Sequence, residues 1–426
     1  MQRLLRRLWI GFLFAGCVSE VALAQKTLTW QQVRDEFEKS NPTLRAARIG
    51  IDQSRAQEVT AYLRPNPDIT TSIDQINPFS KNPIDKYSPF SEALPYVSAS
   101  YLHERRHKRE LRLESAKKGT SIAEFNHSDL DRTMLFNLRS AFVSTLQAKA
   151  VLELATEDLA YWDHVLEISR IRFHAGDIAQ VDLDRLELQR IQYESEVQTA
   201  EVDLRTAKIQ LLTLLNDRTP IDQFDVTGPY DFSDQLLPRD EFRKIAIDTR
   251  PDLKAAVEAV EKAQTDHQLA AANGSTDPTF SAWYTHNSSN NNPFGLNTLG
   301  VSVSVPLRIF DRNQGEKLRT ELDITRQQRL RDAAEATVLS DVDSGYAVIE
   351  SNLNLLRPYK QKYLQQATRV RDTIFFSYQH GGASLLDFLS AQSDYRTVQL
   401  NYLNLIGSYL TAAAQLNMAV GREVVP

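Results

Sequence analysis

The chain has 426 residues, of which 24% are charged and 42% are hydrophobic, and its formal net charge is −6. This length allows more than one domain. Nothing in this charge balance suggests a nucleic-acid partner, which would favour a clustered basic face, so we expect none.

The N-terminus has the three parts of a secretory signal peptide. Three arginines among the first seven residues precede an apolar run over 8–18, and Ala22-Leu23-Ala24 supplies the small residues of a cleavage site. We therefore assign 1–24 as a signal peptide. In an alternative reading, Cys17, the single cysteine, is acylated as the first residue of a lipoprotein. No later stretch approaches the ~20 apolar residues of a spanning helix.

The sequence is duplicated. Residues 172–216, beginning RFHAGDIAQVDLDRLE, match 377–421, beginning SYQHGGASLLDFLSAQ, without a gap. NPTLRAARIGI (41–51) likewise matches RPDLKAAVEAV (250–260). Each copy continues through a proline-containing break into short alternating strands and a long helical pattern. The order helix, strand, loop, strand, long helix, tip, helix therefore occurs twice.

Four short strands alternate apolar and small polar residues. We expect them at about 68–76, 94–103, 279–287 and 298–308. The alternation fits a wall between lipid and an aqueous lumen, and it equally fits a half-buried soluble sheet. Polar loops at 77–90 and 287–298, and aromatic residues placed to serve at a membrane interface, favour the membrane. These aromatic residues are Tyr96, Tyr101, Trp283 and Tyr284.

Four strands cannot close a barrel, and lipid does not tolerate an open sheet edge. If the strands span a membrane, several subunits must therefore share one barrel. The strand count thus predicts an oligomer.

Helical periodicity covers 105–173 and 312–380, or roughly 100 Å each. The apolar residues step by three and four, which is coiled-coil spacing. Pro358 should kink or divide the second helix. Each long helix returns through a glycine-containing tip as a shorter antiparallel helix. The predicted boundaries are 1–24 (signal peptide), 25–216 (first repeat, tip about 174–181), 217–249 (irregular linker against the middle of the helices) and 250–426 (second repeat, tip about 379–386).

The two tips hold the candidate functional residues. Gly176, Gly381 and Gly382 should permit the chain reversals. Asp182 and Asp387 follow, where an acid also stabilises a helix N-terminus. In a symmetric oligomer each acid would recur around the axis, and a carboxylate ring at a constriction selects cations.

His103-Glu104-Arg105-Arg106-His107 matches the H-E-x-x-H pattern of zinc peptidases. The motif leaves a strand and is rich in arginine, which would repel a cation. We therefore predict no enzyme, no cofactor and no metal site, and leave the role of the basic segment 102–112 open.

The two ordered sets of motifs resemble the TolC-type outer-membrane efflux proteins along essentially the whole mature chain. The segments that carry the resemblance are NPTLRAAR with LRPNPDI, RPDLKAAVEAV with DPTFSAW, LGVSVSVPLRIFDRNQGE, and both tips. IFDRNQGE (309–316) is most similar to the heavy-metal, CzcC-like branch. The resemblance implies a homotrimer with a twelve-stranded barrel and a helical periplasmic tunnel. It implies an acidic constriction at Asp387, whose second acid is replaced here by Ser390.

The resemblance also implies that the tips at Gly176, Gly381 and Gly382 dock onto a periplasmic adaptor that works with an inner-membrane pump. The predicted function is a passive export channel in the outer membrane of a Gram-negative bacterium, with heavy-metal cations as the favoured solutes. The alternatives are the outlet of a type I protein secretion system and a soluble periplasmic coiled-coil adaptor.

Overall fold

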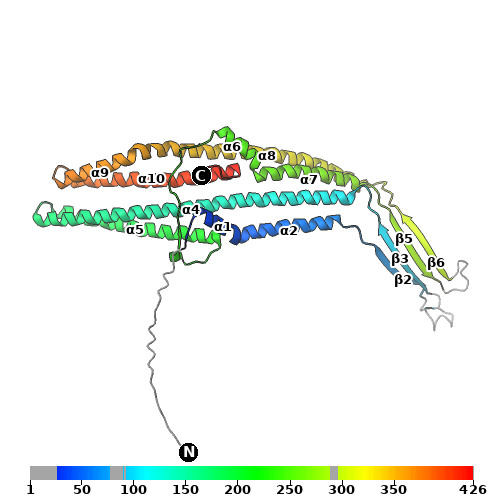
Figure 1. The fold of residues 1–426 in the computed structure, drawn as a ribbon. Helices are drawn as coiled ribbons and strands as arrows, with labels where there is room; N and C mark the ends of the chain where they lie inside the picture. Colours follow the sequence, from blue (N-terminus) through cyan, green and yellow to red (C-terminus); the bar gives the residue numbers. More distant parts are fainter. Residues whose placement is uncertain (1–25, 77–89, 91–92, 288–295, 426) are drawn as a thin grey trace, which may run out of the picture.

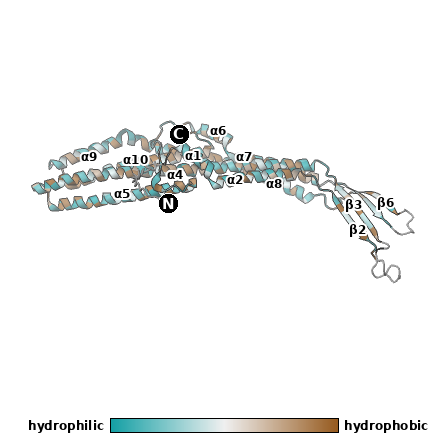
Figure 2. Cartoon of the chain, turned by 60° about the horizontal axis from the view of Figure 1, so that its bottom comes forward, coloured by the Kyte–Doolittle hydropathy of each residue, from teal (hydrophilic) through white to brown (hydrophobic). Residues whose placement is uncertain are grey.

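The computed structural model describes residues 26–76, 90, 93–287 and 296–425, so the predicted signal peptide and Cys17 lie outside it. The prediction of a mainly helical chain with a small sheet is confirmed. Long helices run side by side, and the main sheet lies at one end of them (Figure 1). Hydrophilic and hydrophobic residues alternate along these helices (Figure 2). No helix in the described ranges is long and apolar enough to cross a bilayer.

The same order of elements occurs in both halves. The first half contains α1 (Trp30–Ser40), α2 (Pro42–Tyr62), β2 (Asp68–Asp74), β3 (Leu94–Leu102), α4 (Lys108–Ala175) and α5 (Gln180–Leu215). The second contains α6 (Arg239–Thr249), α7 (Pro251–Asn273), β5 (Thr279–His286), β6 (Asn297–Ser304), α8 (Gln314–Pro358), α9 (Leu364–Gln379) and α10 (Leu385–Val420). β6 stops short of the expected residue 308, since Pro306 cannot donate a hydrogen bond to a neighbouring strand.

The segment 217–249, expected to be irregular, contains regular elements. β4 (Phe224–Val226) pairs in parallel with β1 (Lys26–Leu28). α6 has the length of α1, and each of the two is followed by a helix that begins with proline. The repeated order therefore begins near residue 239 rather than 250. The sequence pattern was weak because the charged first turn of α6 leaves only Phe242 and Ala246 as fully buried residues.

Pro358 divides the second long helix, as predicted. α8 ends there, and one π-helical turn (Tyr359–Tyr363) leads into α9. Proline lacks the backbone N–H that an uninterrupted α-helix would use at this position, and a π-helical turn accommodates the change in pairing.

The core follows the length of the bundle rather than forming one centre. One apolar cluster joins α6, α8 and α10, a second joins α1, α4 and α5 with β1 and β4, and a third lies between the two hairpin tips. The linker joins the first two clusters, because the Tyr230 hydroxyl donates to the Leu403 carbonyl over 2.8 Å and its ring packs against both. The first and third clusters contain residues of both halves, so the halves are held together at more than one level of the bundle.

The main sheet has the strand order β2-β3-β5-β6, with every neighbouring pair antiparallel. One row across it is Ile69, Ala99, Ala282 and Val301, and the adjacent row is Thr70, Ser98, Trp283 and Gly300. Side chains of neighbouring rows point to opposite faces. The sheet thus has one apolar face and one face dominated by small and polar residues. The apolar face has no cover within the described chain at Leu299 and Val301, each 83% exposed.

The strand register contradicts the predicted membrane-interface role of two of the four aromatic residues. Tyr101 and Tyr284 lie in rows of the apolar face, whereas Tyr96 and Trp283 lie in rows of the polar face. The Trp283 indole covers Gly300, where a Cβ would come within 2.3 Å of the ring. Trp283 therefore packs across the polar face and cannot contact lipid on the apolar face.

The basic segment after β3 fastens the sheet to the helices. The Lys108 ammonium lies 2.6 Å from an Asp277 carboxylate oxygen and 3.0 Å from the Ser275 carbonyl, and its side chain is 4% exposed. The Arg105 backbone N–H donates to the other Asp277 oxygen over 3.0 Å. Arg112 binds Glu104 through two hydrogen bonds of 2.5 and 2.9 Å. Much of this charge is therefore structural.

The H-E-x-x-H pattern does not form a peptidase site. His107 precedes the first residue of α4 with φ 54°, and the His103 backbone N–H donates to the Pro278 carbonyl over 2.9 Å. The two histidines are therefore not one turn apart on a helix, as zinc binding by this motif requires. No group of three or more potential metal ligands occurs in the described ranges.

Lys108→Ala should lower the thermal melting temperature, because it leaves the Asp277 carboxylate poorly solvated without its cation. Burial opposes ionisation of Asp277, but hydrogen bonds from Lys108 and the Arg105 backbone hold its pKa below the ordinary value. Loss of one partner of a buried pair costs about 3 kcal/mol. Circular dichroism melts of the purified protein measure the effect. Lys117→Ala, at an exposed position of α4, is the control, and equal melting temperatures for both variants would contradict the structural role.

Candidate functional site

The two hairpin tips have the same backbone geometry. At the first, Gly176 has φ 84° and the Asp177 N–H donates to the Arg172 carbonyl over 2.9 Å. At the second, Gly381 has φ 73° and the Gly382 N–H donates to the Ser377 carbonyl over 2.8 Å. This is the Schellman motif that ends a helix. Of the three tip glycines, Gly176 and Gly381 have positive φ and Gly382 does not, so the backbone conformation does not require glycine at position 382.

The two predicted acids begin the returning helices but have different surroundings. Asp387 accepts hydrogen bonds from the Ser384 N–H (3.0 Å) and hydroxyl (2.7 Å), while its own N–H donates to the Ser384 hydroxyl. This capping box lowers the pKa of the exposed Asp387 carboxyl. Asp182 has no such cap, and its charge contributes to a raised pKa at Tyr378, where burial is the main cause. Asp387 therefore has a structural role that Asp182 lacks.

Aromatic side chains fasten the two tips together. Phe388 of α10 stacks on Trp162 of α4, with ring centroids 5.8 Å apart and planes inclined by 5°. Its ring also lies nearly parallel to Tyr378, at 5.4 Å. The Trp162 ring packs against Tyr193 of α5 at 5.1 Å, and its N–H donates to the Leu186 carbonyl. Two hairpins from opposite halves of the sequence thus share one core.

A buried polar cluster lies beside the aromatic core. Asp158 of α4 is 5% exposed, and its carboxylate is 3.7 Å from the Arg396 guanidinium of α10, which also pairs with Glu196 of α5. The Gln392 amide has no hydrogen-bond partner in the described chain, and neither does one Asp158 oxygen. Burial raises the pKa of Asp158 to about 6, although Arg396 opposes the rise. Burial also raises the pKa of Tyr193 to about 12.

One member of this cluster, Asp158, could have been recognised from the sequence, but the prediction did not consider it. Asp158 is three residues after Ala155 and four before Trp162, two of the apolar residues that step by three and four along α4. A residue at these spacings lies on the same helix face, so an acid there is expected to be buried. Its partners on α5 and α10 have no such signal, because only tertiary packing brings them near.

The comparisons with known proteins agree with this geometry. The sequence model of the family described as outer membrane efflux protein matches residues 243–422. The cobalt-zinc-cadmium resistance protein CzcC of Cupriavidus metallidurans is 22% identical over 388 residues, which cover 90% of this chain and 87% of that protein. The outer membrane protein TolC of Escherichia coli is 21% identical over 71% of this chain and 64% of its own.

The second half of the chain thus matches the outer membrane efflux protein family, and nearly the whole chain is similar to CzcC. Among solved structures, a CusC structure is similar with a TM-score of 0.77 at 17% identity, covering 92% of both chains. An open-state structure of the MtrE outer membrane channel of Neisseria gonorrhoeae is similar with a TM-score of 0.73 at 17% identity, covering 93% of this chain and 89% of that one. The chain thus has the fold of these channels, and the comparisons support an outer-membrane efflux channel over the alternative of a soluble adaptor.

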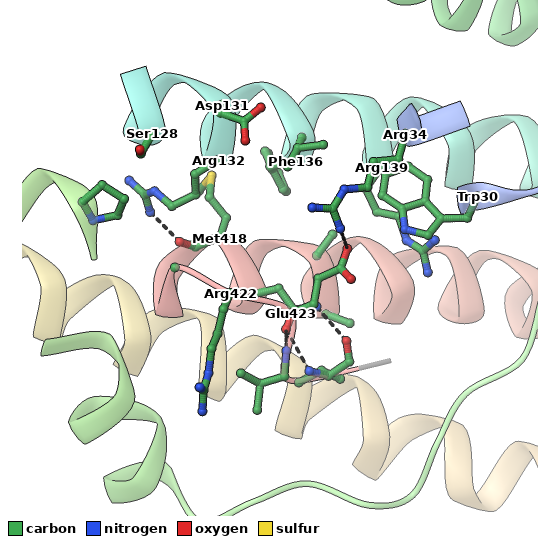
Figure 3. A pocket seen from close by; sticks show the side chains of 18 of the residues that line it. Trp30, Arg34, Ser128, Asp131, Arg132, Phe136, Arg139, Met418, Arg422 and Glu423 are labelled. Carbon is green, nitrogen blue, oxygen red and sulfur yellow. Dashed lines mark hydrogen bonds and ion pairs between the residues drawn. The ribbon is translucent and has the colours of Figure 1, made fainter. Parts of the chain in front are cut away.

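A pocket of about 680 Å³ lies between α4 and α10, where the two halves meet (Figure 3). Arg132 crosses it to donate to the Met418 carbonyl, and Arg34 lies 3.6 Å from Glu423. The Arg139 guanidinium is 4.6 Å from the Trp30 ring centroid, and burial lowers its pKa. The arginines thus join the N-terminal helix and the C-terminus to the wall of the bundle.

Asp158→Asn should raise the melting temperature at neutral pH and reduce its dependence on pH. The Asp158 pKa is about 6 in the folded chain against an ordinary value of 3.8, so the folded state binds this proton more tightly. The unfolding free energy therefore falls as the pH rises from about 4 to about 6, by up to about 3 kcal/mol.

Circular dichroism melts at pH 5 and pH 7 measure this effect. The groups facing Asp158 are Glu196 and Tyr193 of α5, Arg396 of α10 and, from α9, Arg371. Asp203→Asn, an exposed change on α5, is the control and should leave the pH dependence unchanged. An Asp158→Asn protein with the wild-type pH dependence would show that this carboxyl does not titrate near pH 6.

Proposed function

We propose that three copies of this chain form a passive conduit with a shared twelve-stranded barrel and a helical periplasmic tunnel. The observation that carries the proposal is the amphipathic sheet, whose edge strands β2 and β6 have no further partner within the described chain. In a bilayer the backbone groups of both edges need partners. Pairing of β2 in one copy with β6 in the next supplies them.

Exposed apolar side chains along both flanks of the bundle support this assembly. α2 flanks α4 on one side, and α8 flanks α7 on the other. Val59 and Leu63 are 66% and 60% exposed at one flank, and Leu322 is 62% exposed at the other. A helix with apolar residues on its outward face normally packs against another helix. The flanks of adjacent copies would cover one another.

We propose that the exported solutes are heavy-metal cations, and that the tips dock onto a periplasmic adaptor that connects the channel to an inner-membrane pump. The metal proposal is supported by the likeness to CzcC, whose name describes cobalt, zinc and cadmium resistance. It is also supported by the acids at the tips, since carboxylates favour cations. Type I protein secretion remains the alternative, because a wide aqueous duct would serve both.

Asp182→Asn combined with Asp387→Asn should lower the cation selectivity of single channels in planar bilayers. Under a salt gradient the reversal potential should move toward zero, because the tips lose carboxylate charge in every subunit. The asparagine that replaces Asp387 keeps an oxygen that can accept from Ser384, so the helix cap is disturbed little. Asp203→Asn controls for the loss of an acid elsewhere. An unchanged reversal potential would exclude the carboxylate ring.

Gly176→Leu should abolish export while sparing the oligomer. A Cβ at Gly176 meets no atom within 4 Å, so the change adds bulk to the tip surface and backbone strain of about 1 kcal/mol. A deletion strain carrying this variant should remain as sensitive to Co²⁺, Zn²⁺ and Cd²⁺ as the empty deletion strain. Gly315→Leu is the control, since its Cβ also meets nothing within 4 Å but lies at the start of α8.

Full metal resistance from the Gly176→Leu protein would contradict docking at this tip. A deletion strain that tolerates all three metals normally, but loses secretion of a protein substrate, would favour the type I outlet instead.

A further inference from the structure

Where the sheet joins the helices, some positively charged side chains form no ion pair within the described chain. Lys108, Arg109 and Arg112 are paired with carboxylates. Arg64, just before β2, and Arg106, just before α4, are exposed. In the described part of the chain no ion pair or hydrogen bond is found for the side chain of either. Two free guanidinium groups thus remain at one place in the fold.

Arg64 and Arg106 line the same pocket, of about 440 Å³. The backbone of Arg106 and His107 has positive φ (58° and 54°), a conformation that costs non-glycine residues about 1 kcal/mol or more each. Tyr101, His103 and the turn before α4 complete the pocket. Two acidic residues also line it, Glu104 and Glu110, and they are paired with Arg112 and Arg109 respectively. The contacts of Lys108 and the Arg105 backbone with Asp277 hold the segment that forms one wall of the pocket.

The pocket lies at the end of the apolar face rather than the polar one. Tyr101 is in the row of Phe280, which belongs to the apolar face. The His103 ring lies edge-on to Phe280, with centroids 6.5 Å apart. A molecule bound in the pocket would therefore also contact the apolar face, which the proposed function places in lipid.

The matching junction of the second half is apolar. Leu307 and Phe310, between β6 and α8, are 80% and 90% exposed. Both junctions contact the C-terminal end of α7 or the turn after it, because Lys108 binds the Ser275 carbonyl and the Asn313 amide donates to the Ala270 carbonyl. Free arginines and exposed apolar side chains at one level are the composition of a membrane interface.

We propose that the pocket of Arg64, Arg106 and His107 binds the phosphate of an anionic phospholipid in the periplasmic leaflet, with the acyl chains against Tyr101 and Phe280. The inference rests on the proposed function, since it requires the sheet to lie in the membrane. A soluble anion would use the cations but would gain nothing from the adjoining apolar face. Basic pockets at a membrane surface characteristically bind lipid headgroups.

The test is a titration of the purified full-length protein in mild detergent, read by native mass spectrometry. The probes are dioleoyl phosphatidylglycerol, dioleoyl phosphatidylcholine and inorganic phosphate. The wild-type protein should retain phosphatidylglycerol about tenfold more strongly than phosphatidylcholine. Raising the salt from about 0.1 to about 0.5 M should reduce this preference severalfold. Inorganic phosphate at millimolar concentration should not displace the lipid.

The variant is Arg64→Gln with Arg106→Gln, which should bind the two lipids nearly equally. Arg218→Gln with Arg329→Gln removes the same charge from exposed positions on the middle of the bundle and should keep the preference. Equal retention of both lipids by the wild type, or a preference that survives in the Arg64/Arg106 variant, would overturn the proposal. Displacement of lipid by inorganic phosphate would identify a soluble-anion site and would overturn it as well.

Planar-bilayer conductance of the same preparations separates this inference from the proposed function. Conducting channels without lipid preference would reject only the headgroup site. Wild-type protein that neither conducts nor sediments with outer membranes would reject the proposed conduit itself.

Discussion

A sheet of four strands with one apolar face leaves two edges whose backbone groups have no partner within the described chain. In water such edges invite aggregation, and in lipid each unsatisfied group costs several kcal/mol. The rest of the structure is consistent with this constraint. The apolar rows from Ile69 to Val301 are uncovered, and the exposed apolar flanks of the helices continue along the same two sides. One copy of the chain therefore has the surfaces expected of one subunit in a larger closed assembly.

Contacts between charged groups hold the sheet in place on the helices. The strands and the helices meet only through short turns, so a small number of contacts must hold the angle between them. The Asp277 carboxylate lies 2.6 Å from the Lys108 ammonium and accepts a hydrogen bond from the Arg105 backbone N–H. It thus links the start of α4 and the segment after β3 to the turn before β5. Removing these ions from water is unfavourable, and the contact is favourable only because each partner is nearly fully satisfied.

At the other end the two hairpins are held by contrasting interactions. The stack of Trp162, Phe388 and Tyr378 is apolar and well packed. Beside it, Asp158 and Gln392 are buried with incomplete hydrogen bonding. Buried polar groups with incomplete hydrogen bonding lower stability locally. The aromatic stack therefore supplies the stability of this contact between the hairpins, and the polar cluster reduces it.

The sequence by itself determined the features that depend on local periodicity. These were the duplication, the alternating strands, the long helices, the division at Pro358, and the glycine reversals at 176 and 381. Each follows from a repeat of two or 3.6 residues, or from the φ range of one residue, and a neighbouring segment is sufficient to reveal it. The family resemblance rested on the same signals in a fixed order.

Tertiary structure alone decided the features that depend on contacts between distant residues. Lys108 meets Asp277 across 169 positions, and Arg396 of α10 meets both Asp158 and Glu196. The strand register placed Tyr96 and Trp283 on the polar face, and packing against α8 and α10 made a helix of the charged segment α6. No local pattern contains these partners, because the free energy that fixes them comes from burying groups that the sequence keeps far apart.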